Sequence, residues 1–265
     1  MLTYRDFVIG FRKLEIDNTH PVIVHASLSD FGKVHGGAET ILGALSSSFN
    51  TLIMPAFTYK TMITPEVGSP DNAIRYGSGK YTNLMSEIYY ANMPVDPLMG
   101  DVAEAMRIHP RALRSAHPIL SFVGIHAKPI LDSQTIKAPL FPIQKLMDGQ
   151  GWVLLLGVDQ TANTSIHYAE RLAGRKQFIR WALTNKGIIP CQGFPGCSDG
   201  FEELAPHLEK IIHRIEVGKA LIQAIPVVGL VSITCEILKA DPSALLCGRK
   251  DCLRCKAIRA SLVEQ

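Results

Sequence analysis

A histidine and a glutamate three residues apart are the pair of side chains best suited to chemistry in this sequence. They are His167 and Glu170, within the segment TSIHYAE at residues 164–170. On a helix, residues three apart share one face, so the two side chains are expected to be neighbours. A carboxylate beside an imidazole orients the ring and raises its basicity, which suits a general base acting on an amine nucleophile. The same spacing also fits an ordinary surface pair, and the spacing alone leaves both interpretations open.

A second group of polar residues lies in the stretch RSAHPILSF at residues 114–122. The proline that follows His117 biases this histidine toward extended backbone, so its imidazole is expected on a loop or at the start of a strand. The guanidinium of Arg114 can bind a phosphate through two parallel hydrogen bonds, and the hydroxyls of Ser115 and Ser121 can donate further ones. An ordinary loop capped by serine is the alternative.

A third candidate is the segment HASLS at residues 25–29, which follows an apolar run and precedes Gly36 and Gly37. Glycine allows close approach of a ligand to the backbone, and exposed amides before a helix suit an anion. The segment is neither a P-loop nor a G-x-G-x-x-G fingerprint. Ser27 also lies outside a G-x-S-x-G elbow, which would have indicated a hydrolase.

The cysteines form a cluster toward the C-terminus. Cys247, Cys252 and Cys255 are spaced as C-x4-C-x2-C, while Cys191 and Cys197 bracket a loop rich in glycine and proline. In a reducing compartment such spacing indicates metal binding or thiolate chemistry more than disulfides. With Cys197 as the preferred fourth ligand, or else Cys191, the thiolates could close a tetrahedral structural zinc site. Unligated thiols are the alternative.

The framework that must position these residues alternates strands and helices. Apolar runs at residues 22–24, 51–54 and 152–156 predict buried strands, and the last is typical of the centre of a parallel sheet. Helical periodicity appears at residues 3–14, 38–45, 101–108 and 164–172. We therefore expect an α/β fold with a mostly parallel central sheet flanked by helices. The helix at 164–172 then begins at the sheet edge where ligands bind in such folds.

The whole chain, residues 1–265, is expected to form one domain with a small cysteine-bearing subregion at 187–265. Residues 59–81 are irregular and polar, as in a long functional or disordered loop. Further helices are expected at 83–92 and 201–217. The apolar stretch 220–238 is interpreted as helix, turn and strand.

Composition narrows the class of function. The chain has 265 residues, of which 47% are hydrophobic and 19% charged, with a formal net charge of +3. This charge is too small to indicate nucleic-acid binding or an anionic membrane surface. The sequence shows neither an apolar run long enough to span a membrane nor a secretory leader, so a cytoplasmic location is expected.

The sequence resembles the aminoglycoside 3-N-acetyltransferase family, also described as the antibiotic N-acetyltransferase fold. Five segments occur in the family's order and cover roughly residues 1–185: VHASLSDFGKVHGGAETILGAL (24–45), MPAFTY (54–59), RSAHPILSFVGIHA (114–127), VLLLG (153–157) and NTSIHYAER (163–171). The patterns RSxHPxxSF and TxxHxAE are the more specific of these. A G-x-G-S-P element common in the family is replaced by KAPLFP at 137–142, so the acceptor side is expected to differ.

The resemblance implies an antibiotic N-acetyltransferase-like fold that uses acetyl-CoA as co-substrate and transfers its acetyl group directly to an amine. The acceptor would be a small molecule, for example the 3-amino group of an aminoglycoside, and no metal would take part in the chemistry. His167 and Glu170 match the family's catalytic histidine and its acidic partner, and His117 could assist. The residues matching the coenzyme-binding walls are Ser27, Leu28, Ser29, Arg114, Ser115, His117, Ser121 and Phe122.

Two other functions stay open at this stage. One is a coenzyme A-dependent acyltransferase acting on a non-antibiotic amine, since a polycationic aminoglycoside needs a carboxylate-rich pocket that the sequence does not locate. The other is a zinc-containing binding module, in which Arg249, Lys250, Arg254 and Lys256 engage a partner. A solvated basic face is the commoner explanation of such residues. The sequence does not define an oligomeric state.

Overall fold

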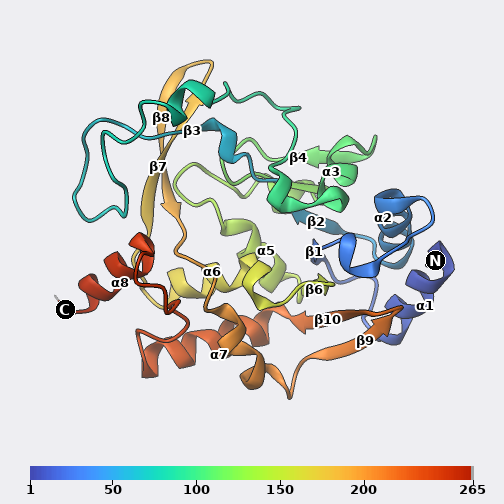
Figure 1. Ribbon diagram of the computed structural model, residues 1–265. Helices are drawn as coiled ribbons and strands as arrows, with labels where there is room; N and C mark the ends of the chain where they lie inside the picture. Colours follow the sequence, from blue (N-terminus) through green and yellow to red (C-terminus); the bar gives the residue numbers. More distant parts are fainter. Residues whose placement is uncertain (264–265) are drawn as a thin grey trace.

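Seven strands form the central sheet of the computed structural model, which describes residues 1–263 (Figure 1). The last two residues of the expected 1–265 domain lie outside the described residues. The strand order is β4-β5-β2-β1-β6-β10-β9. The strands are β1 (Val22–Ala26), β2 (Leu52–Pro55), β4 (Ala112–Arg114), β5 (Phe122–Ile125), β6 (Trp152–Leu156), β9 (His213–Val217) and β10 (Ala220–Pro226).

The three strands at the centre of this sheet are parallel. Strand β1 pairs in parallel with β2 on one side and with β6 on the other. Toward both edges the pairing is antiparallel: β5 pairs with β2 and β4 on one side, and β10 pairs with β6 and β9 on the other. The outermost strands consequently run in the direction of the central three. The predicted α/β class and the predicted central strands are confirmed.

Helices cover both faces of the sheet. Alternation along β6 sends Leu154 and Leu156 into one core and Val153 and Leu155 into the other. The first core is closed by helices α1 (Tyr4–Lys13), α2 (Gly37–Ser48) and α3 (Asp101–Ile108). The second is closed by α4 (Lys128–Leu131), α5 (Phe141–Asp148), α6 (Thr164–Leu172) and α7 (Val227–Ala240).

A smaller sheet stands beside the second core (Figure 1). It consists of β3 (Met62–Ile63), β7 (Phe178–Thr184) and β8 (Gly187–Phe194), all antiparallel. Phe178, Ala182, Cys191 and Phe194 from this sheet belong to the same hydrophobic cluster as the central strands. The hairpin is therefore packed onto the main body and forms a wall beside the sheet.

The cysteine-bearing subregion differs from its prediction in two stretches. Residues 201–217, expected as one helix, form a 3-10 helix at Phe201–Leu208 and then strand β9. The stretch 220–238 has the reverse of the expected order, with strand β10 first and helix α7 after it. Pro226, which has no N–H to donate, ends the strand and caps the helix. The chain ends in α8 (Leu253–Val263).

The helix expected at residues 83–92 is also wrong. Only Thr82–Met85 is helical, as a short 3-10 turn, and the following residues run to a single bridge between Tyr89 and Thr184. A proline at position 94 disfavours helix just before it. No helix among residues 1–263 is both long and apolar enough to span a membrane.

Candidate active site

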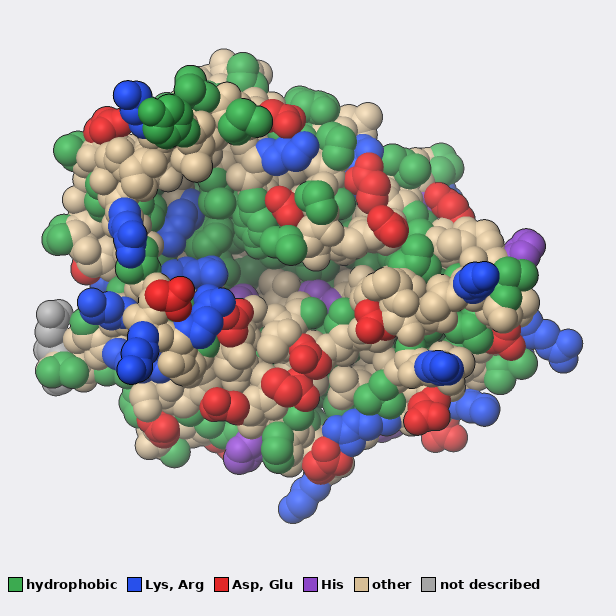
Figure 2. Space-filling view, in the orientation of Figure 1, with side chains coloured by type: hydrophobic (Ala, Val, Ile, Leu, Met, Phe, Trp, Pro, Cys, Tyr) green, Lys and Arg blue, Asp and Glu red, His purple; other side chains and the backbone are tan. Residues whose placement is uncertain are grey.

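A cavity of about 740 Å³ opens at the carboxyl ends of the three parallel strands. His25 and Ala26 from β1 and Met54 and Pro55 from β2 line it, together with the start of α6, which follows β6. Because parallel strands end at the same edge of a sheet, the residues that follow them converge there. Figure 2 shows the hollow, with hydrophobic side chains on its upper wall and histidines at its floor.

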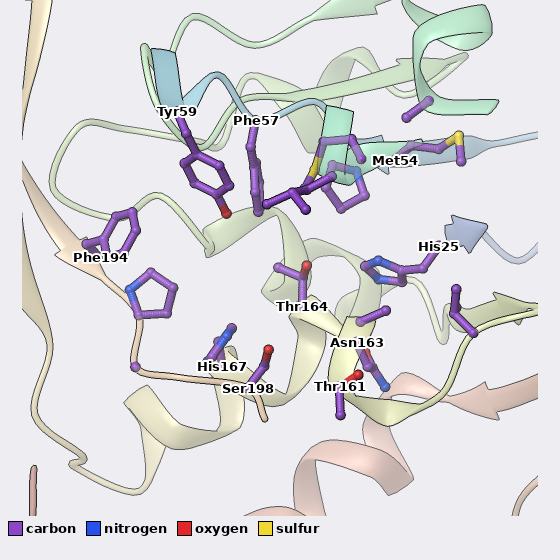
Figure 3. A pocket seen from close by; sticks show the side chains of 18 of the residues that line it. His25, Met54, Phe57, Tyr59, Thr161, Asn163, Thr164, His167, Phe194 and Ser198 are labelled. Carbon is purple, nitrogen blue, oxygen red and sulfur yellow. The ribbon is translucent and has the colours of Figure 1, made fainter. Parts of the chain in front are cut away.

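Helix α6 carries His167 into this cavity. The side chain of Asn163 caps the helix by accepting a hydrogen bond from the N–H of Ser165 at 3.1 Å. This fixes the first turn, so that Thr164 and His167 both face the cavity (Figure 3). The ring of His167 packs edge-on against Phe201 with centroids 4.7 Å apart. The orientation of the ring is therefore held by packing as well as by its hydrogen bond to Glu170.

His167 is bonded to the carboxylate of Glu170. The distance from Nδ1 of His167 to Oε2 of Glu170 is 2.6 Å, and the glutamate side chain is only 1% exposed. The other carboxylate oxygen, Oε1, accepts a hydrogen bond from Nη1 of Arg175 at 2.7 Å. Burial raises the pKa of Glu170, but the hydrogen bonds and charges of His167 and Arg175 outweigh it and hold this pKa below its ordinary value.

This arrangement leaves one nitrogen of His167 available for a substrate. An ionised carboxylate only accepts hydrogen bonds, so the proton between the two side chains belongs on Nδ1 of His167. Nε2 then carries the lone pair, as a general base requires. The structure thus brings together the histidine and glutamate paired in the sequence. It adds Arg175, which the sequence gave no reason to select because it lies beyond the end of α6.

His25 is a second histidine at the cavity. It is the fourth residue of β1, and its ring points into the cavity (Figure 3). Its Nε2 is buried and makes no hydrogen bond with any residue in the described range 1–263. Burial lowers the pKa of His25 to about 3, so the ring is neutral at physiological pH. It offers the cavity an uncharged donor or acceptor.

The predicted coenzyme contact by Arg114 stays a prediction, and in this structure the donors of Arg114 contact other parts of the fold. Its guanidinium donates to the carbonyl oxygen of Ala56 at 2.5 Å and also to that of Met93, and its Nε donates to Ser121 at 3.0 Å. Ser121 itself donates to the Ala56 carbonyl at 2.7 Å. These donors are used to connect loops of the fold, and Arg114 does not line the cavity.

Three further residues of the 114–122 stretch also point inward. The Ser115 hydroxyl accepts a hydrogen bond from the N–H of Phe122 at 2.8 Å, and the Phe122 ring is fully buried. Nδ1 of His117 accepts hydrogen bonds from the N–H groups of Ile119 at 3.1 Å and Leu120 at 2.9 Å. Burial lowers the pKa of His117 to about 4. None of these side chains lines the cavity, and coenzyme binding by this stretch stays a prediction.

The predicted segment Ser27, Leu28 and Ser29 lies just beyond Ala26, at the cavity's margin. Its side chains are half-buried or exposed and do not line the cavity. The hydroxyls of Ser27 and Ser29 are 2.9 Å apart, and both donate to the carboxylate of Asp30. A coenzyme phosphate at these hydroxyls would therefore lie next to a negative charge. Coenzyme binding by this segment stays a prediction.

The wall opposite His167 comes from residues that the sequence did not single out. The aromatic rings of Phe57 and Tyr59 lie across the cavity from His167, and Phe194 of β8 continues this wall (Figure 3). Their centroids are 5.9 Å apart for Phe57 and Tyr59 and 6.5 Å for Tyr59 and Phe194. Phe57 and Tyr59 belong to the segment MPAFTY, whereas β7–β8 had no predicted strands.

Two arginines give this end of the cavity a positive charge. Arg180 of β7 stacks over the ring of Phe194 at 4.9 Å. Burial, with the nearby charge of Arg254 of α8, lowers the pKa of Arg180 to about 10. Within residues 1–263 neither arginine is in an ion pair. Asp199, the one carboxylate among the cavity's described lining residues, is paired with Arg249 outside it at 3.0 Å.

The four cysteines chosen as possible ligands lie together. The sulfurs of Cys197, Cys247, Cys252 and Cys255 are all within 4.8 Å of one another and all four residues are buried. Cys191 lies apart from this group, in β8. The cluster borders the cavity because Gly196 and Ser198, on either side of Cys197, line it.

Comparison with known proteins places these features in a family. Residues 23–239 match the family model described as aminoglycoside 3-N-acetyltransferase. The chain is 26% identical over 247 residues to aminoglycoside N(3)-acetyltransferase III of Salmonella sp., covering 77% of this chain and 79% of that protein. It is 32% identical over 163 residues to the SPbeta prophage-derived aminoglycoside N(3')-acetyltransferase-like protein YokD of Bacillus subtilis (strain 168), covering 56% of this chain and 57% of that relative.

The fold is shared with solved structures. The crystal structure of YokD from Bacillus subtilis superposes with a TM-score of 0.79 at 24% identity, covering 91% of this chain and 95% of that one. A structure described as AAC-IIIb binary with CoASH superposes with a TM-score of 0.73 at 19% identity, covering 90% and 96%.

Proposed function

The chain belongs to the aminoglycoside 3-N-acetyltransferase family, and from this premise we propose that it transfers the acetyl group of acetyl-CoA directly to an amino group of a small molecule. Such a reaction makes it an acyltransferase that uses acetyl-CoA as co-substrate. The observation that carries the proposal is the buried chain of His167, Glu170 and Arg175 at the floor of the cavity, with contacts of 2.6 and 2.7 Å. A related fold has been solved with coenzyme A, which supports the same co-substrate here.

His167 acts as the general base in this reaction. An aliphatic amine with a pKa of about 10 is protonated at neutral pH and becomes nucleophilic only when it loses a proton. The amine first loses this proton to solvent, and Nε2 of His167 accepts a second proton from the nitrogen as the neutral amine attacks the thioester carbonyl. The carbon–nitrogen bond forms, the carbon–sulfur bond breaks, and the proton passes to the departing thiolate of coenzyme A. Glu170 stabilises the imidazolium that exists between these steps.

The tetrahedral intermediate of this transfer needs hydrogen-bond donors at its oxyanion. The hydroxyls of Thr164 and Ser198 lie beside His167 in the cavity (Figure 3), and they are the donors we assign to this task. The aromatic wall of Phe57 and Tyr59 excludes water from the opposite side. Binding the amine and the thioester together in this space orients them for direct attack without an acyl-enzyme.

The acceptor has two candidates. The names of the relatives support an aminoglycoside, whose 3-amino group would be the nucleophile. The charge of the cavity supports a different amine, because Arg180 and Arg254 lack a carboxylate partner within residues 1–263 and would repel a polycation. An acceptor that carries a carboxylate or phosphate beside its amine would satisfy these arginines. Coenzyme A phosphates are the other available anions.

Thiol release from acetyl-CoA in the presence of a panel of amines tests the reaction. The panel contains aminoglycosides and amines that bear a carboxylate or a phosphate. We expect His167→Ala to lower kcat by about 10²- to 10⁴-fold, the usual contribution of a general base, with little change in acetyl-CoA affinity. His207→Ala, which removes an exposed histidine outside the cavity, is the matched control. A stably folded His167→Ala protein with wild-type turnover would exclude this base.

The two acceptor classes are separated by Arg180→Leu. If the arginine pair binds an anionic acceptor, the KM for that amine rises while the KM for acetyl-CoA stays constant. If the pair binds a phosphate of the coenzyme, the KM for acetyl-CoA rises and the anionic acceptor loses its support. Faster turnover of aminoglycosides by wild-type enzyme than of any acidic amine would decide for the family's substrate.

A further inference from the structure

Four cysteines from three separate segments of the chain meet beside the active-site cavity. Cys197 lies in the loop after β8, Cys247 in the segment between α7 and α8, and Cys252 and Cys255 at the start of α8. Their sulfurs are within 4.8 Å of one another, and the sulfurs of Cys247 and Cys255 are 3.4 Å apart. We propose that these four cysteines bind one structural zinc ion, and that this ion holds a wall of the cavity in place.

The geometry fits a tetrathiolate zinc site. Four sulfurs at about 2.3 Å from a central zinc ion form a tetrahedron with edges of about 3.8 Å, close to the spacing found here. A disulfide needs sulfurs at about 2.05 Å, and all six cysteines are free thiols in this structure. Cys252 and Cys255 also have the C-x2-C spacing common in zinc sites. Simple burial of small apolar side chains would not require four sulfurs to share one point.

The surroundings of the cluster suit a negative charge. Four thiolates with one zinc ion carry a net charge of −2, which needs donors and cations nearby. Nη2 of Arg259 donates to the carbonyl oxygen of Cys247 at 2.8 Å. Arg249 pairs at 3.0 Å with Asp199, which lies two residues after Cys197. Arg249 and Arg254, considered above as possible contacts to a partner, thus serve the segments that hold the cysteines.

The cluster is built into the cavity wall. Gly196 and Ser198, which flank Cys197, line the cavity, as does Arg254, which precedes Cys255. Nη1 of Arg254 donates to the carbonyl oxygen of Gly196 at 2.8 Å, so the loop and the helix contact each other on the cavity side as well. A metal ion that joins Cys197 to Cys255 therefore sets the position of Arg254 and Ser198 in the cavity.

The cluster also supports the catalytic pair. Arg175, which holds Glu170, donates from Nη2 to the carbonyl oxygens of Pro242 at 2.6 Å and Ala244 at 2.7 Å. These carbonyls lie in the segment that leads to Cys247 three residues later. On the other side, a Cβ added at Gly196 would be 3.8 Å from the Glu170 carboxylate, so the Cys197 loop packs against it. Zinc makes the cluster a positioning element for Glu170 rather than a participant in acetyl transfer.

Metal content is the first test and needs no substrate, so its outcome is independent of the proposed reaction. Protein prepared without chelators and with zinc in the growth medium is expected to contain about one zinc per chain by elemental analysis, with X-ray absorption showing about four sulfur neighbours at about 2.3 Å. Cys252→Ser should lower the zinc content at least tenfold, while Cys191→Ala, which removes a buried thiol outside the cluster, should keep it. Iron in place of zinc, or six titratable thiols without metal, would overturn the site.

The structural consequence is tested on the wild-type chain, so that the result does not depend on whether a cysteine variant folds. Removal of zinc with a chelator should speed amide hydrogen exchange at least tenfold at residues 195–199 and 242–255, and zinc should restore protection. Exchange in the central strands β1 and β6 serves as the internal control and should change little. A chain that binds one zinc but shows equal exchange at residues 195–199 with and without it would refute the link between the metal and the cavity wall.

Discussion

The guanidinium of Arg175 is expected to stabilise the folded protein more than any surface ion pair. It contacts the Glu170 carboxylate at 2.7 Å, and the two side chains are 3% and 1% exposed. Arg175→Met keeps an apolar side chain of similar length but leaves the buried carboxylate without this cation. It also removes the donors to the carbonyl oxygens of Pro242 and Ala244. The variant therefore isolates the contribution of the charge and its hydrogen bonds.

The size of the effect follows from the burial of both partners. Breaking a buried ion pair by removal of one partner costs about 3–5 kcal/mol, because the remaining charge is left uncompensated. For a chain of this size each kcal/mol corresponds to roughly 2–4 °C, so we expect the Tm to fall by about 6–20 °C. Arg214→Met is the control: its pair with Glu209 at 2.7 Å is exposed, with exposures of 32% and 58%. That pair should contribute only about 0–1 kcal/mol.

The pH dependence gives the prediction a second measurable feature. The pKa of Glu170 lies below its ordinary value of 4.5 in the folded protein. Its ionised form therefore contributes stability above the unfolded pKa, and this contribution is lost as the pH falls through the folded pKa. The difference in Tm between wild type and Arg175→Met should be full above the Glu170 pKa of the variant, which loss of the cation raises, and should shrink as the pH falls toward the lower pKa of the wild type.

Thermal unfolding followed by circular dichroism from pH 4 to pH 8 measures both features. A loss of Tm no greater than that of the Arg214→Met control at pH 7 would refute the assignment of a large contribution to this buried pair. A Tm difference that stays constant into acid would show that packing, rather than the ionised carboxylate, is responsible.

Three further predictions concern residues at or near the site. Glu170→Gln should lower kcat less than loss of His167. It should also move the acidic limb of the pH–rate profile to lower pH, because the imidazolium loses its counter-ion. An unmoved limb would contradict a role of Glu170 in proton transfer. Arg114→Met should lower the Tm yet keep the ratio of affinities for coenzyme A and dephospho-coenzyme A, as measured by calorimetry. A selective loss of affinity for coenzyme A would show that Arg114 binds the terminal phosphate. Burial lowers the pKa of His25 to about 3 from 6.5, so the unfolded state binds more protons between these values and stability falls as the pH drops through them. His25→Asn should therefore lose less stability in acid, as measured by thermal melts. Equal slopes of Tm against pH for wild type and variant would contradict a contribution of His25 to the acid loss.

Local sequence patterns determined the elements at the centre of this protein. The run at residues 152–156 is apolar at nearly every position, as required of a strand buried on both faces, and it forms β6. Helical periodicity similarly predicted helix α6 at residues 164–172. His167 and Glu170 could be paired from their spacing because a contact between residues three apart depends on one turn of helix alone.

Elements whose conformation depends on distant partners were not predictable in the same way. The stretch 220–238 is mostly apolar, and its division into β10 and α7 depends on pairing of the first part with β6. Residues 213–217 became a strand because β10 provides their partner. Short apolar segments fit both a helix and a strand, so tertiary contacts decide between them.

The roles of the charged and sulfur-bearing residues were likewise decided by tertiary structure. The type of residue at Arg114 suggested a phosphate ligand, whereas in the fold its donors contact backbone carbonyls. Arg180 and Arg254 are the arginines that line the cavity. The sequence alone proposed four thiols as ligands but left Cys191 and Cys197 as alternatives. Pairing of β8 with β7 buries Cys191 in the hydrophobic core, whereas the loop after the strand turns Cys197 toward the other three sulfurs. A side chain's type is local information, but its neighbours across the chain are set only when the sheets pack.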